Sequence, residues 1–220
     1  MQFSILGTGS SGNCFLINDD LMIDAGLPYS KIKDKVKNVR YVLLTHIHGD
    51  HLNMTTVRKI FVAHENIKFV CGQWLIEKLL KSGIDKDRIL PIEFGKVYQL
   101  GDYKISPIIA FHDVENCGYR IMYDGKKHLH ITDTCTLDGI EAKGYDSASI
   151  ECNHEINKAL ELIKEAEENG EFSHLKGAIN SHLAVHKAIQ FCKENKISKL
   201  YPIHIGSSTK KEVIEALKRW

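Results

Sequence analysis

Residues 43–52 read LLTHIHGDHL and carry three histidines and one aspartate within six consecutive positions. They follow the apolar, β-branched run YVLLT at residues 41–45, which predicts a buried strand. Gly49 lies inside the cluster and allows the chain to turn sharply after that strand. The histidine cluster is therefore expected at the end of a strand, where ligand-binding side chains are commonly presented.

The four polar side chains of this stretch predict a site for two metal ions. His46 and His48 are two residues apart and can project to the same side of the strand end. Asp50 and His51 begin the next element, so they are offset towards a second ion. Six consecutive residues cannot wrap one cation tetrahedrally, so a single ion is the weaker interpretation. A polar turn with chance histidines is also weaker, because the cluster lies where a strand meets a Gly-containing turn. Histidine and aspartate without cysteine suit zinc or a similar divalent ion.

Further candidate ligands stand at later strand ends. His112 follows the apolar run at residues 103–111, Asp133 follows HLHIT at residues 128–132, and His204 ends the run KLYPIHI at residues 199–205. We expect all of these side chains to converge in one site. The full set of predicted ligands is His46, His48, Asp50, His51, His112, Asp133 and His204.

Length and composition are those of one globular domain. The chain has 220 residues, of which 43% are apolar and 26% charged, and we expect a single domain over residues 1–220. The net charge of +1 gives no general reason to expect a polyanionic partner. The first residues lack the basic segment of a signal peptide, and no run approaches the ~20 apolar residues of a membrane span. The six scattered cysteines are expected to be reduced thiols, so the chain is predicted to be cytoplasmic.

Alternating short apolar runs and amphipathic segments predict a layered α/β (α+β) domain with sheets inside and helices outside. The strand-like runs are at residues 3–6, 14–17, 21–24, 41–45, 67–71, 103–111, 119–123, 128–132, 147–151 and 199–205. The predicted helices are at residues 29–36, 55–64, 74–82, 155–168, 185–193 and 210–218.

The arrangement of His-x-His-x-Asp-His after a strand, with single His, Asp and His residues at later strand ends, resembles the metallo-β-lactamase superfamily. The resemblance covers nearly the whole chain and implies a four-layer αββα sandwich. The segments FSILGTGSSGN, LLTHIHGDH, IECNHE and INSHLAVHKA resemble the YycJ-type nuclease branch. The segments SHLAVHKAIQFCK and PIHIGSS are also similar to RNase Z, and the anti-Pycsar cyclic-nucleotide phosphodiesterases lie near the same branch.

Carried over by position, the resemblance implies two divalent ions, with zinc as the expected metal and manganese as the alternative. One ion would be held by His46, His48 and His112. The other would be held by Asp50, His51 and His204, with Asp133 bridging the two. Asp24, in MIDAG, matches a position that supports the ligands from behind.

The same resemblance implies phosphodiester hydrolysis. Two ions about 3.5–4 Å apart can activate water and clamp a phosphate, and Asp50 belongs to this catalytic centre. His182 is the candidate general acid and Glu151 the candidate partner that orients and charges it. His182 could instead contact phosphate, or could lie at a helix N-terminus where Ser181 is an equally plausible N-cap. Glu151 could instead be a solvated carboxylate at a strand end.

Other polar residues carry weaker expectations. His154, Ser207 and Ser208 are candidate substrate contacts. The segment GTGSSGN at residues 7–13 is better explained as a tight turn between strands than as a phosphate-binding loop, because no Gly-Lys-Ser/Thr follows. The remaining histidines are expected to be surface or packing residues, namely His64, His128, His130, His174 and His186.

The expected substrate follows from the segment at residues 155–171, which holds six glutamates where the nucleases it resembles carry a basic stretch. Acids close to the site would repel a polyanion, although the same helix could simply face solvent. This favours a small cyclic nucleotide as the substrate, with a YycJ-like DNA exonuclease as the alternative. A nucleotide-sequestering protein without turnover and a thioester or lactam hydrolase remain open. The expected partner is a nucleotide or nucleic-acid phosphodiester, with no membrane and with a homodimer as a further option.

Overall fold

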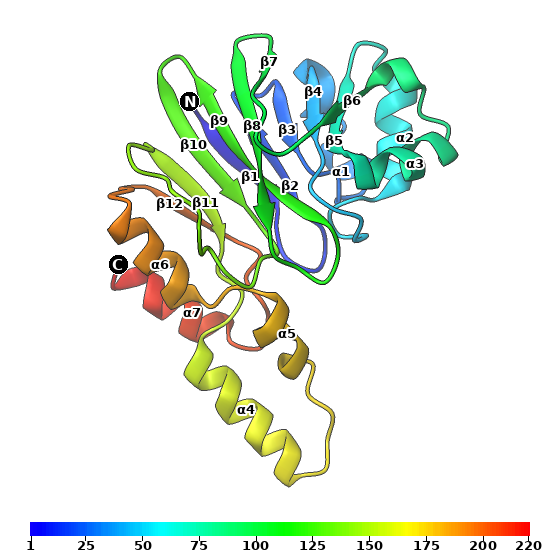
Figure 1. Ribbon diagram of the computed structural model, residues 1–220. Coiled ribbons are helices and arrows are strands. Elements are labelled where there is room, and N and C mark those ends of the chain that lie inside the picture. The colour runs from blue at the N-terminus through cyan, green and yellow to red at the C-terminus, as the bar shows by residue number, and fades with distance from the viewer.

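Two six-stranded β-sheets lie face to face in the computed structural model, which describes residues 1–220 (Figure 1). The first sheet has the order β1-β2-β3-β4-β5-β6, and the second has the order β12-β11-β10-β9-β8-β7. The strands of the first sheet are β1 (Phe3–Gly7), β2 (Cys14–Ile17), β3 (Leu21–Ile23), β4 (Tyr41–Leu43), β5 (Lys68–Gly72) and β6 (Ile89–Ile92). Those of the second are β7 (Tyr98–Leu100), β8 (Tyr103–Ala110), β9 (Asn116–Tyr123), β10 (Lys126–Ile131), β11 (Ser147–Glu151) and β12 (Leu200–Ile203).

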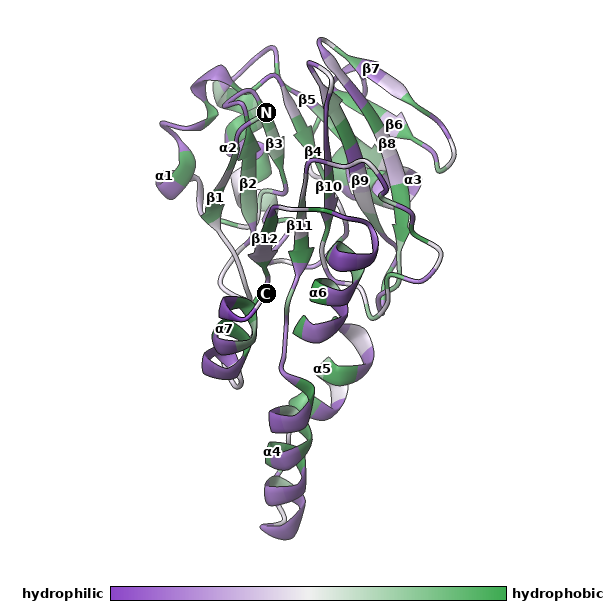
Figure 2. Ribbon diagram, turned by 90° about the vertical axis from the view of Figure 1, so that its left-hand side faces the viewer, coloured by the Kyte–Doolittle hydropathy of each residue, from purple (hydrophilic) through white to green (hydrophobic).

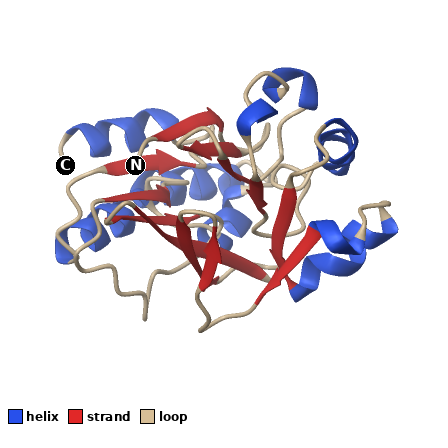
Figure 3. Ribbon diagram, turned by 90° about the horizontal axis from the view of Figure 1, so that it is seen from above, coloured by secondary structure: helices blue, strands red, loops and turns tan.

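Helices cover the outer face of each sheet (Figure 3). One hydrophobic cluster joins the first sheet to its helices, a second joins the second sheet to its helices, and a third fills the space between the sheets. The helices on the first sheet are α1 (Tyr29–Ile32), α2 (Met54–Ala63) and α3 (Gln73–Lys81). Those on the second are α6 (Val185–Glu194) and α7 (Lys210–Lys218). The four-layer αββα sandwich expected from the sequence is confirmed.

The apolar runs of the central strands are continuous because both of their faces are buried. In β2, Phe15 and Ile17 pack between the sheets, whereas Cys14 and Leu16 pack against the helices. Side chains alternate between the two faces of a strand, so a strand covered on both sides needs apolar residues at every position. The sandwich therefore buries the same runs that identified the strands.

Most predicted elements are confirmed, and the exceptions have physical reasons. Strand β6 was not predicted because Pro91 lies within it, and proline is tolerated there because β6 is an edge strand. Helix α5 (Leu175–Ser181) was not predicted because it buries no residue and contains Gly177. The helix predicted at residues 29–36 ends at Ile32, and a separate 3₁₀ turn follows at Val36–Asn38. The short strand β7 and the 3₁₀ turn Lys86–Arg88 were also not predicted.

Helices α4 (Ile156–Glu168) and α5 form an arm that extends away from the sandwich (Figures 1 and 2). Most of the glutamates of residues 155–171 lie on α4, which is largely hydrophilic in Figure 2. Only Ala159 and Ile163 of α4 are buried. The acidic row is therefore carried outward on the arm, and the alternative that this helix faces solvent describes it better.

The cysteines have the reduced form that the sequence predicts. All six cysteines are free thiols, and all except Cys135 are buried. No helix combines the length and the apolar character that crossing a bilayer requires.

The topology brings several strand ends to one edge of the sandwich. Strands β3 to β6 run parallel, as do β10 to β12 in the other sheet. Strand β8 also runs in the direction of β10, because both are antiparallel to β9. The carboxyl ends of β4, β8, β10, β11 and β12 are each followed by a predicted site residue. Open sheets with parallel strands usually bind ligands at this edge.

Candidate metal centre

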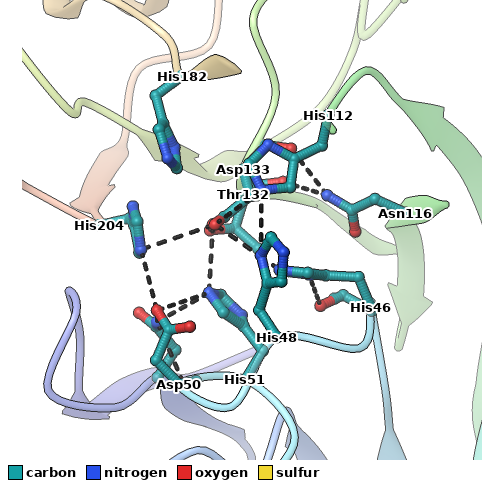
Figure 4. A network of polar contacts seen from close by, with 12 residues as sticks. His46, His48, Asp50, His51, His112, Asn116, Thr132, Asp133, His182 and His204 are labelled. Carbon is teal, nitrogen blue, oxygen red and sulfur yellow. Dashed lines mark hydrogen bonds and ion pairs between the residues drawn. The ribbon is translucent and has the colours of Figure 1, made fainter. Parts of the chain in front are cut away.

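The predicted ligands gather at this edge around the carboxylate of Asp133 (Figure 4). Three groups of side chains place one possible ligand atom of each member within 4.8 Å of the others. The groups are His46, His48, His112 and Asp133; Asp50, His51 and His204; and Asp133, Glu151, His182 and His204. The first two correspond to the two predicted ligand sets. The sequence thus predicted which residues would converge, and their function as ligands stays a proposal.

The first group has the donors that a metal ion requires. His46 Nε2 and His112 Nε2 each lie 3.7 Å from Asp133 Oδ2, and His48 Nδ1 lies 3.3 Å from His112 Nε2. His46 Nε2 is buried and has no hydrogen-bond partner. Buried polar nitrogens are almost always paired, so this orphaned atom fits a cation better than it fits an apolar core.

The second group contacts both oxygens of the same carboxylate. His51 Nε2 lies 3.2 Å from Asp133 Oδ1, and His204 Nε2 lies 3.4 Å from Asp50 Oδ2. Asp50 Oδ2 is also 3.6 Å from His51 Nε2. Asp133 Oδ2 also lies 3.7 Å from His204 Nε2, so this carboxylate contacts both groups and stands where a shared ligand would be expected.

Hydrogen bonds behind the rings fix their orientation. Asp24 Oδ2 accepts from His51 Nδ1 at 2.6 Å, and Asp24 Oδ1 accepts from Thr45 N at 2.9 Å. His112 Nδ1 donates to Ser181 O at 3.0 Å. In both histidines the remaining Nε2 is directed into the site. Asp24 thus lies where a supporting carboxylate is expected, and such contacts set the tautomer of ligand histidines.

Backbone strain is concentrated in the site. Of the seven non-glycine residues with positive φ, three are Asp24 at 57°, Asp133 at 49° and His204 at 50°. The left-handed conformation costs of order 1 kcal/mol for a residue with a Cβ. Its recurrence at three neighbouring site residues indicates that these side chains are held in place for function.

Burial and charge set the protonation of the ligand residues. Burial lowers the pKa of His46 to about 2, so this ring is neutral and its Nε2 lone pair is available. Burial also lowers the pKa of His112. Burial acts to lower the pKa of His51, but the carboxylates of Asp133 and Asp24 outweigh it and raise that pKa well above its usual value. The histidines of the site therefore differ in charge preference, because His51 faces two carboxylates whereas burial dominates at His46 and His112.

Glu151 is shared by two histidines. His182 Nδ1 donates to Glu151 Oε1 at 2.5 Å, and His204 Nδ1 lies 3.0 Å from the same oxygen. The other oxygen, Oε2, accepts the backbone N–H groups of Thr134 and Leu183, each at 3.0 Å. Glu151 is fully buried, so the alternative of a solvated strand-end carboxylate is wrong. One carboxylate therefore orients both a predicted ligand and the candidate general acid.

His182 is not at the start of a helix. It follows the last residue of α5 and precedes α6, whose N-cap is Ala184. Ser181 is the last residue of α5, and its hydroxyl donates to Gly177 O at 3.1 Å, so it caps neither helix N-terminus. The helix-capping alternative for His182 is wrong because its imidazole is taken up by Glu151.

The pKa values of the Glu151–His182 pair favour a charged pair. Burial acts to lower the pKa of His182, but the hydrogen bond and charge of Glu151 outweigh it and raise that pKa above 6.5. Burial acts to raise the pKa of Glu151, and the hydrogen bonds from His182 and His204 overcome this and lower it below 4.5. Glu151 thus favours the protonated form of His182.

The segment at residues 7–13 is a turn between β1 and β2, and it also holds the site together. Asn13 Nδ2 lies 3.2 Å from Asp50 Oδ2, and Asn13 N donates to Asp50 O at 2.6 Å. Thr8 Oγ1 accepts from His204 N at 2.6 Å. The sequence does not indicate these roles, because an asparagine after a Gly/Ser-rich turn is too common to reveal them. Nearby, a Cβ on Gly26 would stand 1.7 Å from Asp50 O, so only glycine fits there.

A further carboxylate at the site was not predicted. Asp113 Oδ1 lies 3.0 Å from His112 Nε2 and 3.6 Å from His48 Nε2, and its side chain is largely exposed. In the sequence, the position of Asp113 directly after His112 was the only sign that it could belong to the site.

The weaker candidates occupy different environments. His154 is buried, with Nδ1 unpaired, and its backbone pairs with that of Ala184. Ser207 and Ser208 are exposed on the turn between β12 and α7. His128 and His130 are buried packing residues of β10 that contact the Ser149 hydroxyl at 2.8 Å, in agreement with the expectation for them.

A family model described as a β-lactamase superfamily domain matches residues 20–205 of this chain. The chain belongs to the metallo-β-lactamase superfamily. The match includes all seven predicted ligands as well as Glu151 and His182. The resemblance drawn from the histidine cluster is thereby confirmed.

Similar proteins in this superfamily include nucleases. Exodeoxyribonuclease WalJ of Streptococcus pneumoniae serotype 2 is 29% identical over an alignment of 181 residues, and the match covers 70% of this chain and 63% of that protein. Exodeoxyribonuclease YycJ of Bacillus anthracis is 28% identical over an alignment of 174 residues, and the match covers 71% of this chain and 64% of that protein. The chain thus spans less than two thirds of the length of these curated relatives. The metallo-β-lactamase fold protein YhfI of Bacillus subtilis superposes with a TM-score of 0.77 at 16% identity, covering 99% of this chain and 92% of that one.

Proposed function

We propose that this protein is a metal-dependent phosphodiesterase. The observation that supports this most directly is the 2.5 Å hydrogen bond between His182 and Glu151, the carboxylate that also contacts the predicted ligand His204. The leaving alkoxide of a phosphodiester requires a proton, whereas the thiolate that leaves a thioester does not, so a thioester hydrolase has less use for such an acid.

The residues that would hold two divalent ions are those that converge on Asp133. His46, His48 and His112 would hold the first, and Asp50, His51 and His204 the second. When bound, the two ions supply a Lewis acid for the phosphate and lower the pKa of the attacking water. The nitrogen and carboxylate donors without cysteine suit zinc, with manganese as the alternative.

The chain's own residues supply the proton. Because Nδ1 of His182 is engaged by Glu151, the free donor is Nε2. Its ring packs against those of His204 and His112, with centroids at 5.1 and 5.0 Å. The imidazolium therefore stands at the edge of the ligand cluster and donates to the departing oxygen, and Glu151 stabilises the charged ring until then. Asp50 orients the second ligand group through His204 and His51.

DNA is the first candidate substrate, because the relatives WalJ and YycJ are named exodeoxyribonucleases. The outward direction of the arm supports this, because the acidic row does not lie across the strand-end edge (Figure 1). A cyclic nucleotide is the second candidate. Residues 155–181 carry six glutamates and three lysines, so the arm offers no basic surface for several phosphates of a polyanion.

The test is a hydrolysis screen with added Zn²⁺ or Mn²⁺. Linear DNA, cyclic mononucleotides and bis-p-nitrophenyl phosphate are incubated with the wild type, Asp50→Ala and His182→Ala. We expect wild-type turnover of at least one of them and a strong loss in both variants. His174→Ala is the matched control, because this exposed histidine lies on the arm and should leave turnover unchanged.

Two results would change the proposal. Binding of a nucleotide without any product, equal in the wild type and both variants, would make the protein a nucleotide-sequestering one. Turnover of cyclic mononucleotides with DNA left intact would select the second substrate. A homodimer stays a prediction that sedimentation of the same preparations would address.

A further inference from the structure

A small apolar cleft lies directly beside the first ligand group. Its lining residues are Ile47, Trp74, Val114 and Glu115, and its volume is about 310 Å³. Three of the four residues are hydrophobic, and Glu115 is the polar one. The volume is at the lower end of the range for small-molecule sites, which begins at about 300 Å³. The cleft can therefore hold one flat ring system but not a longer ligand.

The chain ties each wall of the cleft to the predicted metal ligands. Ile47 stands between His46 and His48, and Val114 comes two residues after His112. Trp74 Nε1 donates to Thr45 O at 3.2 Å, which fixes the indole against the residue that precedes His46. Any group in the cleft would thus be adjacent to a phosphate held by the first ligand group.

Trp74 is the aromatic residue of the cleft lining, and a second aromatic ring, Phe94, stacks on it from outside the lining. Trp74 and Phe94 stack with ring centroids 5.6 Å apart and an interplanar angle of 18°. Ile47 is 36% exposed and Phe94 41% exposed, although both are large apolar side chains. Apolar surface gathered at the mouth of a site, rather than scattered over the molecule, indicates a binding surface.

We propose that this cleft binds the base of the nucleotide adjacent to the scissile phosphate. Every base has a π-face that packs on aromatic and aliphatic walls. The Glu115 carboxylate can accept a hydrogen bond from an exocyclic amino group, such as N4 of cytosine, and has no such donor in thymine. The cleft therefore favours an amino-bearing base. This inference rests on the proposed function, because it takes the phosphate of a nucleotide to lie at the metal centre.

Trp74 offers a direct measurement of binding. The chain has two tryptophans, Trp74 and Trp220, so Trp220→Phe leaves Trp74 as the only indole fluorophore. The zinc-supplemented protein is titrated with deoxycytidine 5′-monophosphate, thymidine 5′-monophosphate and deoxyribose 5-phosphate. We expect the cytidine nucleotide to quench Trp74 and to bind about 10-fold more tightly than the base-free sugar phosphate. The thymidine nucleotide should bind about 5-fold more weakly than the cytidine nucleotide.

Two variants assign the effect to the cleft. Val114→Ala should weaken both nucleotides about 3-fold and leave deoxyribose 5-phosphate unchanged. Glu115→Ala should abolish the preference for cytosine over thymine, and the ratio of the two affinities is measured because loss of a carboxylate also changes phosphate affinity. Val62→Ala is the matched control, because Val62 is an exposed valine on α2 outside the cleft.

Equal affinities for the nucleotides and for deoxyribose 5-phosphate would overturn the base subsite. So would a cytosine preference that persists in Glu115→Ala together with unchanged binding in Val114→Ala. DNA hydrolysis by the same preparation is measured separately. Hydrolysis without any contribution of the base would reject the subsite alone, whereas base-dependent binding without hydrolysis of any phosphodiester would reject the proposed enzyme and leave a nucleotide-binding cleft.

Discussion

The two halves of the site are built in different ways. The loop after β4 supplies His46, His48, Asp50 and His51 within six consecutive residues. The opposite half takes Asp133 from just after β10, Glu151 from the end of β11, His204 from just after β12, and His182 from the segment between α5 and α6. The loop half is local in sequence, and the strand-end half exists only because β10, β11 and β12 run parallel in one sheet.

This difference separates metal retention from proton donation. The loop half contains ligand candidates alone, and its rings are held by nearby partners such as Asp24 and Thr45. The strand-end half contains both ligand candidates and the proton donor, joined by the buried carboxylate of Glu151. Metal retention should therefore depend on both halves, whereas proton donation should depend on the strand-end half alone.

Replacing Asp133 should have the largest effect, because its two oxygens face both ligand groups. For Asp133→Ala we expect a loss of activity of at least about 10⁴-fold, since both ions lose a ligand. Elemental analysis of the purified protein should show loss of metal. If the variant retains two ions per chain, the two halves are not joined through this carboxylate.

The variant His182→Ala should separate proton donation from metal retention within the strand-end half. We expect kcat to fall by about 10²- to 10⁴-fold, because the leaving oxygen loses its acid. Metal content should remain that of the wild type, since His204 and Asp133 are intact. A parallel loss of metal and activity would show instead that His182 is a ligand.

Asp24→Asn tests the loop half. The amide can still accept from Thr45 but loses the charge that holds the Nδ1 proton of His51. We expect metal affinity to fall by about 10- to 100-fold, measured by competition with a chelating dye. Activity at saturating metal should recover most of the wild-type value, and a failure to recover would indicate a role beyond support of His51.

The pH profile of kcat should report the protonation of His182 in the strand-end half. The pKa of His182 is raised by Glu151, so the acid form persists above pH 6.5 and is lost as the pH rises through the raised value. We expect kcat to fall about tenfold per pH unit on that alkaline limb. His182→Asn should lack the limb, and an identical limb in that variant would assign it to another group.

Substitutions on the arm should have the smallest effect on activity and on the free energy of unfolding. Phe172 is 81% exposed on the loop between α4 and α5. Phe172→Ser should change the free energy of unfolding by less than about 0.5 kcal/mol and leave hydrolysis of bis-p-nitrophenyl phosphate unchanged. A large loss with that small substrate would mean that the arm reaches the strand-end half, contrary to its outward direction in Figure 2.

The sequence by itself determined a layered α/β fold, a resemblance to the superfamily that the family model confirms, and a set of residues expected to converge. These could be predicted because the signals are local, namely buried strands that appear as continuous apolar runs and a histidine cluster after one of them. Even Asp133 and His204 could be identified, because each directly follows a strand-like run. Their function as ligands is a prediction that the metal measurements above address.

Only the tertiary structure decided how the residues of the site depend on one another. That Glu151 holds both His182 and His204, that Asn13 anchors the loop of Asp50, and that Trp74 lies beside His46 all arise from contacts between distant segments. No local pattern encodes them, because a hydrogen bond across 31 or 53 residues depends on where two distant segments meet in the fold. The direction of the acidic arm was also decided by the tertiary structure, because the composition of a helix gives its charge but not its orientation.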